Sequence, residues 1–262
     1  MKKYLLDLTV KAVEHINDKY VLIKLTDNEP LPEMVPGQFV ELRVDNAPST
    51  FLRRPISIHY VDYATNELWL LVAAVGDGTR KLAALQSGDK LNTLLPLGNG
   101  FTQVAEGKLL LVGGGVGVAP LLYAGKMAKE NGVDVTFLLG ARTANDLLEL
   151  DEFKKYGKVL LTTEDGSAPE GMEDVTEKGF VTQHSMWNDA QFNQVSVCGP
   201  KPMMVAVAKA SRERGLACEV SLENMMACGL GACLCCVEKL NDGNNVCVCK
   251  EGPVFDIEKL NW

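Results

Sequence analysis

The chain has no excess of positive charge and no long apolar run. Its 262 residues include 26 Lys and Arg against 34 Asp and Glu, a formal net charge of −8. Without surplus cations to displace counterions, nucleic acid binding is not expected. No stretch approaches the roughly 18 apolar residues of a membrane helix. The apolar start is cut short by Asp7, Lys11 and Glu14, which argues against a secretory signal. The sequence predicts a cytoplasmic protein with no nucleic acid or membrane partner.

Cysteine is almost absent outside one short segment. Six of the eight cysteines fall between Cys228 and Cys249, and only Cys198 and Cys218 lie elsewhere. Disulfide frameworks belong to short secreted chains. This chain is long, and with 47% apolar residues it can bury an ample core. The clustered thiols therefore indicate metal ligands.

The residue pattern changes twice along the chain, and its length suggests about two domains. Residues 1–104 contain short strand-like runs separated by Gly, Pro, Asn and Asp, which predict an antiparallel β-barrel with one short helix at 79–85. Residues 105–221 alternate strands with helices, which predicts a doubly wound parallel α/β domain. The strands are expected at 108–112, 134–139, 158–162, 194–198 and, last, 217–221, and the helices at 119–130, 145–155 and 201–214. Residues 222–262 form a small Cys-rich module that needs a metal or a partner to fold.

The cysteine spacing predicts an iron–sulfur cluster. Cys228, Cys233 and Cys236 follow the x4 and x2 spacing that plant-type ferredoxins use for three ligands of a [2Fe–2S] cluster. The small residues between Cys228 and Cys233 suit a tight loop whose N–H groups point at sulfur. Cys249 supplies a fourth thiolate after a turn at 241–243.

Alternatives to this ligand set remain open. Cys247 competes for the fourth position, because it shares a face with Cys249 if 246–249 is a strand. Cys235 competes for the third position, although choosing it destroys the x2 spacing. Zinc is the other candidate metal, but zinc sites usually show paired short spacings.

A glycine-rich turn joins the first predicted parallel strand to a helix. Gly113, Gly114, Gly115 and Gly117 precede Pro120, and a helix N-terminus of this kind favours a pyrophosphate. The match to the dinucleotide fingerprint is poor, and a turn that only eases helix–sheet packing is the alternative. A second loop, Cys198-Gly199-Pro200, follows another parallel strand, and ligands bind where such loops meet.

Four motifs, in order, resemble the ferredoxin-NADP reductase family. They are Arg54-Pro55-Ile56-Ser57, Gly76-Asp77-Gly78-Thr79, the turn at 113–120, and Cys198-Gly199-Pro200. That family joins a flavin-binding β-barrel to a nicotinamide-binding α/β domain. The array from Cys228 to Cys249, followed by residues 250–255, resembles one subfamily, the electron-transfer subunits of B-type dihydroorotate dehydrogenases.

The resemblance implies roles for particular residues. Arg54, Pro55, Ile56 and Ser57 hold the FAD, with Arg54 at its phosphates, and the pyrophosphate is bound at Gly78 and Thr79. Leu71, Val72 and Ala73 line the flavin. Gly113, Gly114, Gly115 and Gly117 carry the phosphates of NAD, and Cys198 and Gly199 lie near the nicotinamide and flavin rings. The chain departs from the plastid reductases in having no C-terminal Tyr over the flavin.

The resemblance also implies a function and a partner. Electrons run from dihydroorotate to the FMN of a separate catalytic subunit, then through the [2Fe–2S] cluster and FAD of this chain to NAD⁺, in pyrimidine biosynthesis. Two copies of each subunit are expected in a heterotetramer. The alternatives are a reductase subunit of a hydrogenase or of a ferredoxin:NADP oxidoreductase complex, a redox sensor without turnover, and a zinc-stapled nucleotide-binding module.

The choice between NAD and NADP is not settled by the residues. Glu164 or Asp165 could bind an adenosine ribose and favour NAD, whereas Arg142 could favour a 2′-phosphate. We assign no catalytic acid or base, and we interpret His59 and His184 as ordinary surface or core residues.

Overall fold

The chain folds into two compact units. The computed structural model describes residues 2–189 and 191–262. One unit contains Met1–Gly100 and Glu223–Pro253, and the other contains Phe101–Leu222 and Val254–Trp262. The Cys-rich segment 223–253 therefore belongs to the same compact unit as the N-terminal strands.

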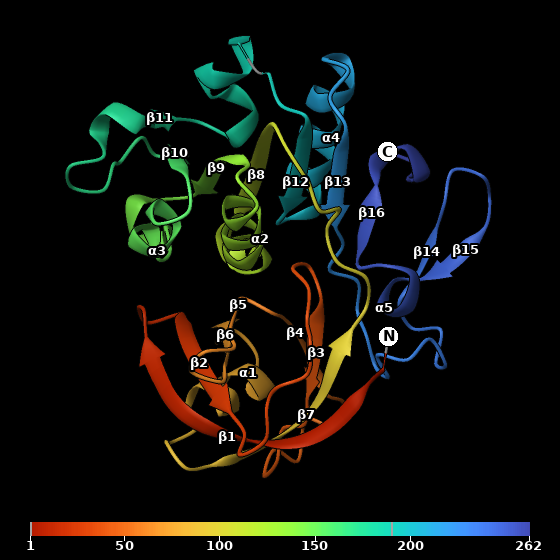
Figure 1. The fold of residues 1–262 in the computed structure, drawn as a ribbon. Helices are drawn as coiled ribbons and strands as arrows, with labels where there is room; N and C mark the ends of the chain where they lie inside the picture. Colours follow the sequence, from red (N-terminus) through yellow and green to blue (C-terminus); the bar gives the residue numbers. More distant parts are fainter. Residues whose placement is uncertain (1, 190) are drawn as a thin grey trace. The chain divides into compact units, whose positions relative to one another are not determined.

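The first unit is built on a curved, seven-stranded antiparallel half-barrel (Figure 1). The strand order is β4-β3-β7-β1-β2-β6-β5. Alternating apolar residues such as Leu8 and Val10 on β1, and Ile23 and Leu25 on β2, are fully buried and form the core of the half-barrel. The strands are β1 (Tyr4–His15), β2 (Tyr20–Thr26), β3 (Phe39–Leu42), β4 (Arg54–Ser57), β5 (Tyr60–Asp62), β6 (Glu67–Ala73) and β7 (Lys90–Leu97).

The single helix of the half-barrel, α1 (Asp77–Ala83), begins two residues earlier than the sequence predicted. The Gly76 N–H donates to Thr79 Oγ1 at 3.0 Å, and that hydroxyl is 3.1 Å from the Gly76 carbonyl. Thr79 closes the first helical turn from within the helix. The prediction was wrong about this boundary because Thr79 resembled the cap that precedes a helix.

The Cys-rich segment of the same unit contains the predicted hairpin. Strands β14 (Val237–Lys239) and β15 (Asn245–Cys247) pair antiparallel, and a short helix, α5 (Val248–Glu251), follows. Asn99, just after β7, joins this segment to the barrel. Its backbone N–H donates to the Gly252 carbonyl at 2.6 Å, and its side-chain amide donates to the Glu251 carbonyl at 2.9 Å.

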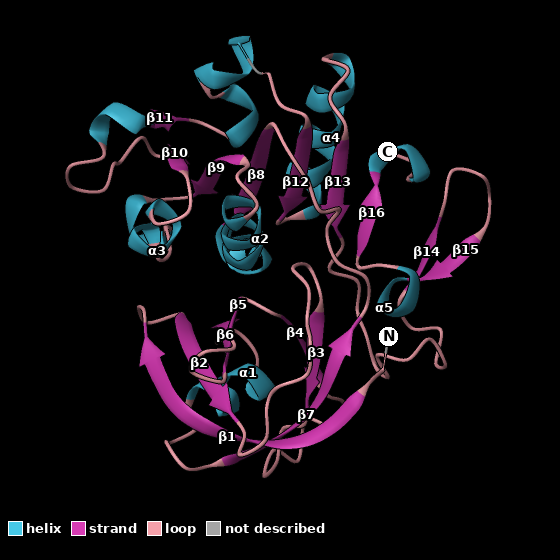
Figure 2. Ribbon diagram, viewed as in Figure 1, coloured by secondary structure: helices cyan, strands magenta, loops and turns pink. Residues whose placement is uncertain are grey.

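The second unit has a seven-stranded sheet in the order β11-β10-β9-β8-β12-β13-β16 (Figure 2). The first six strands are parallel, and the continuous apolar run of β8 is buried on both faces, as in a doubly wound sheet. The strands are β8 (Lys108–Gly114), β9 (Asp134–Ala141), β10 (Lys158–Thr163), β11 (Thr176–Lys178), β12 (Gln194–Cys198), β13 (Cys218–Ser221) and β16 (Val254–Asp256).

Three α-helices cover this sheet. Helix α2 (Ala119–Glu130) contacts β8 and β9, α3 (Leu150–Lys154) contacts β10, and α4 (Lys201–Glu213) contacts β12 and β13. The chain crosses from β8 toward β10 in one direction and from β12 to β13 in the other. Because crossovers of this kind are right-handed, α4 lies on the opposite face from α2 and α3.

Short 3-10 helices connect these elements. They are η1 (Gly115–Val118), η2 (Ala144–Asp146), η3 (Glu173–Val175), η4 (Val181–Gln183), η5 (Ser185–Asp189) and η6 (Ile257–Lys259). No helix among the described residues is long and apolar enough to cross a membrane.

Two predictions about this unit were wrong. β13 is not its last strand, because β16 pairs antiparallel with it and extends the sheet. The helix predicted at 145–155 is divided into η2 and the short helix α3. Leu147 is extended and Glu149 has a φ of +50°, so the backbone between them leaves the helical conformation.

Candidate redox cofactor sites

The predicted flavin residues of the first unit lie on elements that contact one another. Strand β4, which is the motif Arg54–Ser57, contacts β6, whose last three residues are Leu71, Val72 and Ala73, and β6 contacts α1. A Cβ built on Gly78 would lie 3.3 Å from Arg54 Cδ and 3.0 Å from Thr50 Cγ2. The Arg54 side chain therefore packs directly against the first turn of α1.

This arrangement fits a phosphate group. The Arg54 guanidinium donates to the Leu52 carbonyl at 3.0 Å, in a partly exposed position beside Gly78 and Thr79. The space that a Gly78 side chain would take is filled by Arg54 and Thr50, so the Arg54 side chain is held against the start of α1. A guanidinium fixed in this way is suited to a pyrophosphate.

The four predicted cluster cysteines form two pairs. The Cys228 and Cys233 side chains interact with each other, and so do those of Cys236 and Cys249. Backbone N–H groups also point at sulfur. The Gly231 N–H donates to Cys249 Sγ at 3.1 Å, the Leu230 N–H to Cys228 Sγ at 3.4 Å and the Cys249 N–H to Cys236 Sγ at 3.4 Å.

The thiols of these pairs differ in acidity. Burial alone would raise the pKa of the Cys228 thiol, but N–H groups of Leu230, Cys233 and Ala232 outweigh it and lower the pKa to about 6. Burial and the Cys236 side chain raise the pKa of Cys249 to about 12. The Cys228 thiol therefore favours the thiolate form that binds metal, whereas the Cys249 thiol must lose its proton when metal binds.

Two pairs of thiols are compatible with a binuclear cluster, because each iron of a Cys-ligated [2Fe–2S] cluster takes two cysteines. Gly229 (φ +65°) and Gly231 (φ +77°) are in the left-handed region, which lets the loop wrap tightly around the thiols.

The two competing thiols are close to the same loop, and Cys247 lies near enough to Cys236, Cys228 and Cys233 to feel their charges. Strand β15 ends at Cys247, and α5 begins at Val248, so Cys247 and Cys249 do not share one face of a strand. The Cys247 thiol donates to the Gly231 carbonyl at 3.8 Å, on the backbone of the loop. Cys235 is exposed. None of the six cysteines in this described segment forms a disulfide.

The predicted nucleotide residues of the second unit come together where the strand order reverses. β8 and β12 are neighbours, and the chain leaves them in opposite directions across the sheet. A Cβ on Gly117 would lie 2.5 Å from Gly199 Cα and 2.6 Å from the Cys198 carbonyl oxygen. A Cβ on Gly114 would lie 2.5 Å from Met203 Sδ. The two glycine loops thus touch backbone to backbone at the carboxyl ends of parallel strands, where open α/β sheets bind nucleotides.

The residues considered for nucleotide specificity lie in the loops that follow β9 and β10. Asp165 is exposed after β10, and its carboxylate accepts from the Ser167 N–H at 2.9 Å and the Ser167 hydroxyl at 2.7 Å, which keeps the pKa of Asp165 low. The Ser167 oxygen in turn accepts from the Ala144 N–H at 2.8 Å. Ser167 therefore ties the loop after β10 to the loop after β9. Glu164 and Arg142 are also exposed, and the Asp165 N–H donates to the Arg142 carbonyl at 3.2 Å.

Further titratable side chains are buried. They include His59, His184, Glu67 and Glu219, and burial lowers the pKa of His184. Another, Glu41 on β3, is fully buried and was not singled out from the sequence. The sequence does contain a signal for Glu41, because it is the lone carboxylate in the strand-like run from Phe39 to Leu42. In the structure this strand is buried on both faces.

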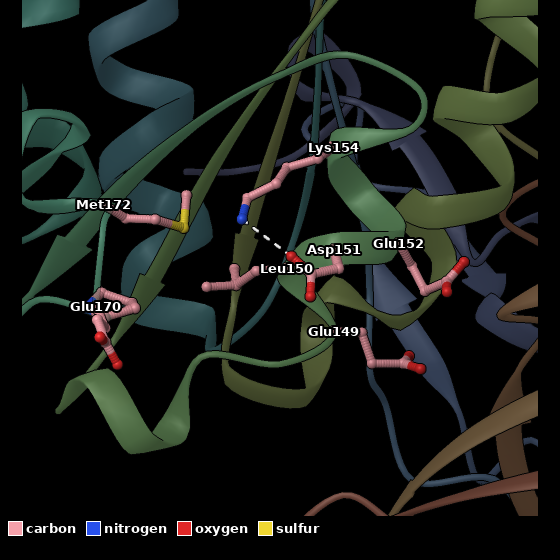
Figure 3. Close-up of a pocket in the computed structure, with 8 residues that line it drawn as sticks. Glu149, Leu150, Asp151, Glu152, Lys154, Glu170 and Met172 are labelled. Atoms are coloured by element: carbon pink, nitrogen blue, oxygen red, sulfur yellow. Dashed lines mark hydrogen bonds and ion pairs between the residues drawn. The ribbon is translucent and has the colours of Figure 1, made fainter.

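A pocket of about 480 Å³ beside α3 contains none of the predicted site residues (Figure 3). Its acidic side chains include Glu149 and Glu170, and Lys154 pairs with Asp151 at 3.0 Å. Four carboxylates against one cation give no reason to assign the pocket to a phosphate-bearing cofactor. Its lining residues are Glu149, Leu150, Asp151, Glu152, Lys154, Pro169, Glu170 and Met172.

Comparison with known proteins defines the class. Residues 111–209 match the oxidoreductase NAD-binding domain, and residues 223–261 match the iron–sulfur cluster binding domain of dihydroorotate dehydrogenase B. A solved structure of an NADH-dependent reduced ferredoxin-NADP oxidoreductase superposes with a TM-score of 0.86 and 30% identity, covering 98% of this chain and 90% of that one. The fold is that of a ferredoxin-reductase-like oxidoreductase with a C-terminal iron–sulfur domain.

Curated relatives narrow the class to one family. The electron transfer subunit of dihydroorotate dehydrogenase B (NAD(+)) from Bacillus velezensis is 38% identical, with 97% of each chain covered. The subunit of the same name from Listeria monocytogenes is 37% identical, over 98% of this chain and 99% of its own length. The chain belongs to the family of dihydroorotate dehydrogenase B electron transfer subunits.

Proposed function

We propose that this chain passes electrons from a dihydroorotate-oxidising catalytic subunit to NAD⁺, using a [2Fe–2S] cluster and FAD, in pyrimidine biosynthesis. The whole-chain likeness to electron transfer subunits of dihydroorotate dehydrogenase B supports this function. The observation that carries it is the placement of the four cysteines in two pairs within the unit that contains the flavin motif. A flavin beside a one-electron centre converts single electrons into a hydride.

We propose the following roles for the cofactor residues. Cys228 and Cys233 hold one iron, and Cys236 and Cys249 hold the other. Arg54, Gly78 and Thr79 bind the FAD phosphates. Pro55, Ile56 and Ser57 hold the flavin, and Leu71, Val72 and Ala73 line it. Gly113, Gly114, Gly115 and Gly117 receive the phosphates of NAD, with Cys198 and Gly199 at the nicotinamide.

The partner we propose is an FMN-containing catalytic subunit, with two copies of each subunit in the complex. Apolar side chains surround the cluster loop and face solvent. Met225 is 81% exposed, Leu230 46% and Leu234 64%. Leu234 has a φ of +59°, a costly conformation for a leucine. Exposed apolar side chains that lie together are typical of a protein interface. Met225, Leu230 and Leu234 lie beside the proposed cluster ligands and suit the surface that receives the catalytic subunit.

A second candidate is a reductase subunit of a ferredoxin:NADP oxidoreductase complex. The TM-score of 0.86 to the NADH-dependent reduced ferredoxin-NADP oxidoreductase structure favours it as the main rival. The two functions share the fold and both cofactor types and differ in the electron donor. The donor must therefore be the variable in the test.

The test is a visible spectrum of the chain purified together with its bound partner under anaerobic conditions. Dihydroorotate should bleach the flavin and iron–sulfur bands, and NAD⁺ should restore them. Bleaching by NADH alone, with no response to dihydroorotate, would assign the chain to the rival complex. A Cys249→Ser variant is the matched control. Its iron–sulfur bands should be lost, and its partner should still be reduced by dihydroorotate without passing electrons to NAD⁺.

A further inference from the structure

The side chain of Glu41 is buried next to the cluster loop. Its relative exposure is 0%, and neither carboxylate oxygen has a hydrogen-bond partner among the described residues. A Cβ built on Gly229 would lie 2.9 Å from Glu41 Cγ and 3.5 Å from Glu41 Oε1. The loop that follows Cys228 therefore rests directly on this carboxyl group.

Strand register places Glu41 between the two cofactor motifs. Glu41 is opposite Pro55 on β4 and opposite Leu94 on β7, so these three side chains share one face. Val40 and Leu42 are opposite Ile56 and Arg54, on the other face. Arg54 and Ile56 of the flavin motif thus lie on one side of the β3–β4 pair, and Glu41 and the cluster loop lie on the other.

Arg53 forms its hydrogen bonds with other groups than the Glu41 carboxylate. It donates to the Glu41 backbone carbonyl at 3.1 Å, to the Asn92 carbonyl at 3.0 Å and to the Asn92 side chain. Burial raises the pKa of Glu41 to about 7, with the charges of Arg53 and Arg54 opposing the rise and that of Cys228 adding to it. A buried carboxyl without a partner is costly for folding and requires an explanation.

We propose that Glu41 sets the reduction potential of the [2Fe–2S] cluster by placing a negative charge in the wall between the cluster loop and the flavin strand. This inference rests on the proposed function. The cluster accepts one electron, with no bond formed or broken, and the potential of such centres depends on local charge and solvent exposure. A negative charge at Glu41 opposes the arriving electron, lowers the potential and favours transfer onward to the flavin.

The expected size follows from Coulomb's law. A unit charge roughly 10 Å away, in an effective dielectric near 20, changes the equilibrium constant for electron uptake by on the order of tenfold. For a one-electron centre, a tenfold change corresponds to about 59 mV. Glu41→Gln should therefore raise the cluster midpoint potential by about that amount at pH 8.5.

The experiment is a dithionite titration of the complete complex, with the cluster followed by its paramagnetic resonance signal and the flavins by absorbance. Glu41→Asp retains the charge and should stay close to the parent potential. Glu67→Gln is the matched control. Glu67 is also buried in this unit, but it pairs with solvent-exposed Lys11 and accepts from Trp69 Nε1 at 2.8 Å, so the cluster potential should not move.

Two results would overturn the proposal. One is an unchanged cluster potential in Glu41→Gln, and the other is an equal rise in Glu41→Asp, which would assign the effect to packing. A parent complex that lacks the cluster and flavin signals would instead refute the proposed function. Intact signals in every variant show that the comparison is between folded, loaded proteins.

Discussion

Alanine at Gly117 should push apart the two loops that meet at the nucleotide site. The added Cβ would lie 2.5 Å from Gly199 Cα and 2.6 Å from both the Gly199 nitrogen and the Cys198 carbonyl oxygen, whereas ordinary contact begins at 3.4 Å. All three atoms belong to backbone, so no side chain can turn away. The loops must therefore separate by about 0.9 Å, the difference between 3.4 and 2.5 Å.

A displacement of this size has a predictable cost. Misplacement of about 1 Å in a binding geometry can lower a rate by about 10²-fold. The catalytic efficiency for NADH, measured with ferricyanide as electron acceptor, should fall by about that factor in Gly117→Ala. The loss of stability should be about 1–3 kcal/mol, as for an overpacked site. The flavin and cluster spectra should be unchanged, because their residues belong to the other unit.

The control is Gly215→Ala. Gly215 lies in the same unit, just after α4, with a φ of +66°, and no atom lies within 4 Å of the position that an alanine Cβ would take there. Alanine at this position costs backbone strain of about 1–2 kcal/mol without steric contact. An efficiency for NADH within about threefold of the parent in Gly117→Ala, or an equal loss in Gly215→Ala, would refute the reasoning.

Three other predictions concern the first unit. Cys249→Ser should abolish the iron–sulfur absorbance while Cys247→Ser retains it, and equal loss in both variants would contradict the thiol pairing. Arg54→Ala should weaken FAD retention by about 10–100-fold, the size of a charged hydrogen bond, as measured by flavin release on dilution. Hydrogen bonds from Lys11 and Trp69 outweigh burial and keep the pKa of Glu67 low, so Glu67 stabilises the fold above its unfolded pKa and loses that contribution as pH falls. Glu67→Gln should lower the melting temperature at pH 7, and the difference from the parent should shrink as the pH falls below the unfolded pKa of Glu67.

Much of the fold could be predicted from local sequence. The apolar run 108–112 lies in β8, the helix at 119–130 is α2, and the strand at 194–198 is β12, because hydrophobic periodicity and turn residues act within a few positions. The helix at 145–155 could not be predicted correctly. Its break depends on the left-handed backbone at Glu149, which no propensity signals.

Part of the candidate cluster site could also be predicted from the sequence. Spacing alone selected Cys228, Cys233 and Cys236, because the loop geometry of a cluster constrains residues close in sequence. It could not decide between Cys247 and Cys249, since that choice depends on where β15 ends. In the structure both side chains lie within electrostatic range of Cys236, and the Cys247 thiol also donates to the loop backbone at Gly231, so Cys249 stays a prediction.

What the sequence determined by itself was therefore the order of the elements, the cysteine spacing and the two glycine loops. The tertiary structure alone decided that segment 223–253 packs with the barrel, that β16 completes the second sheet, and that Gly117 meets Gly199. It also placed Glu41 against the cluster loop. Most of these features join residues that are far apart in the sequence, and only the packing of the folded chain brings such residues together.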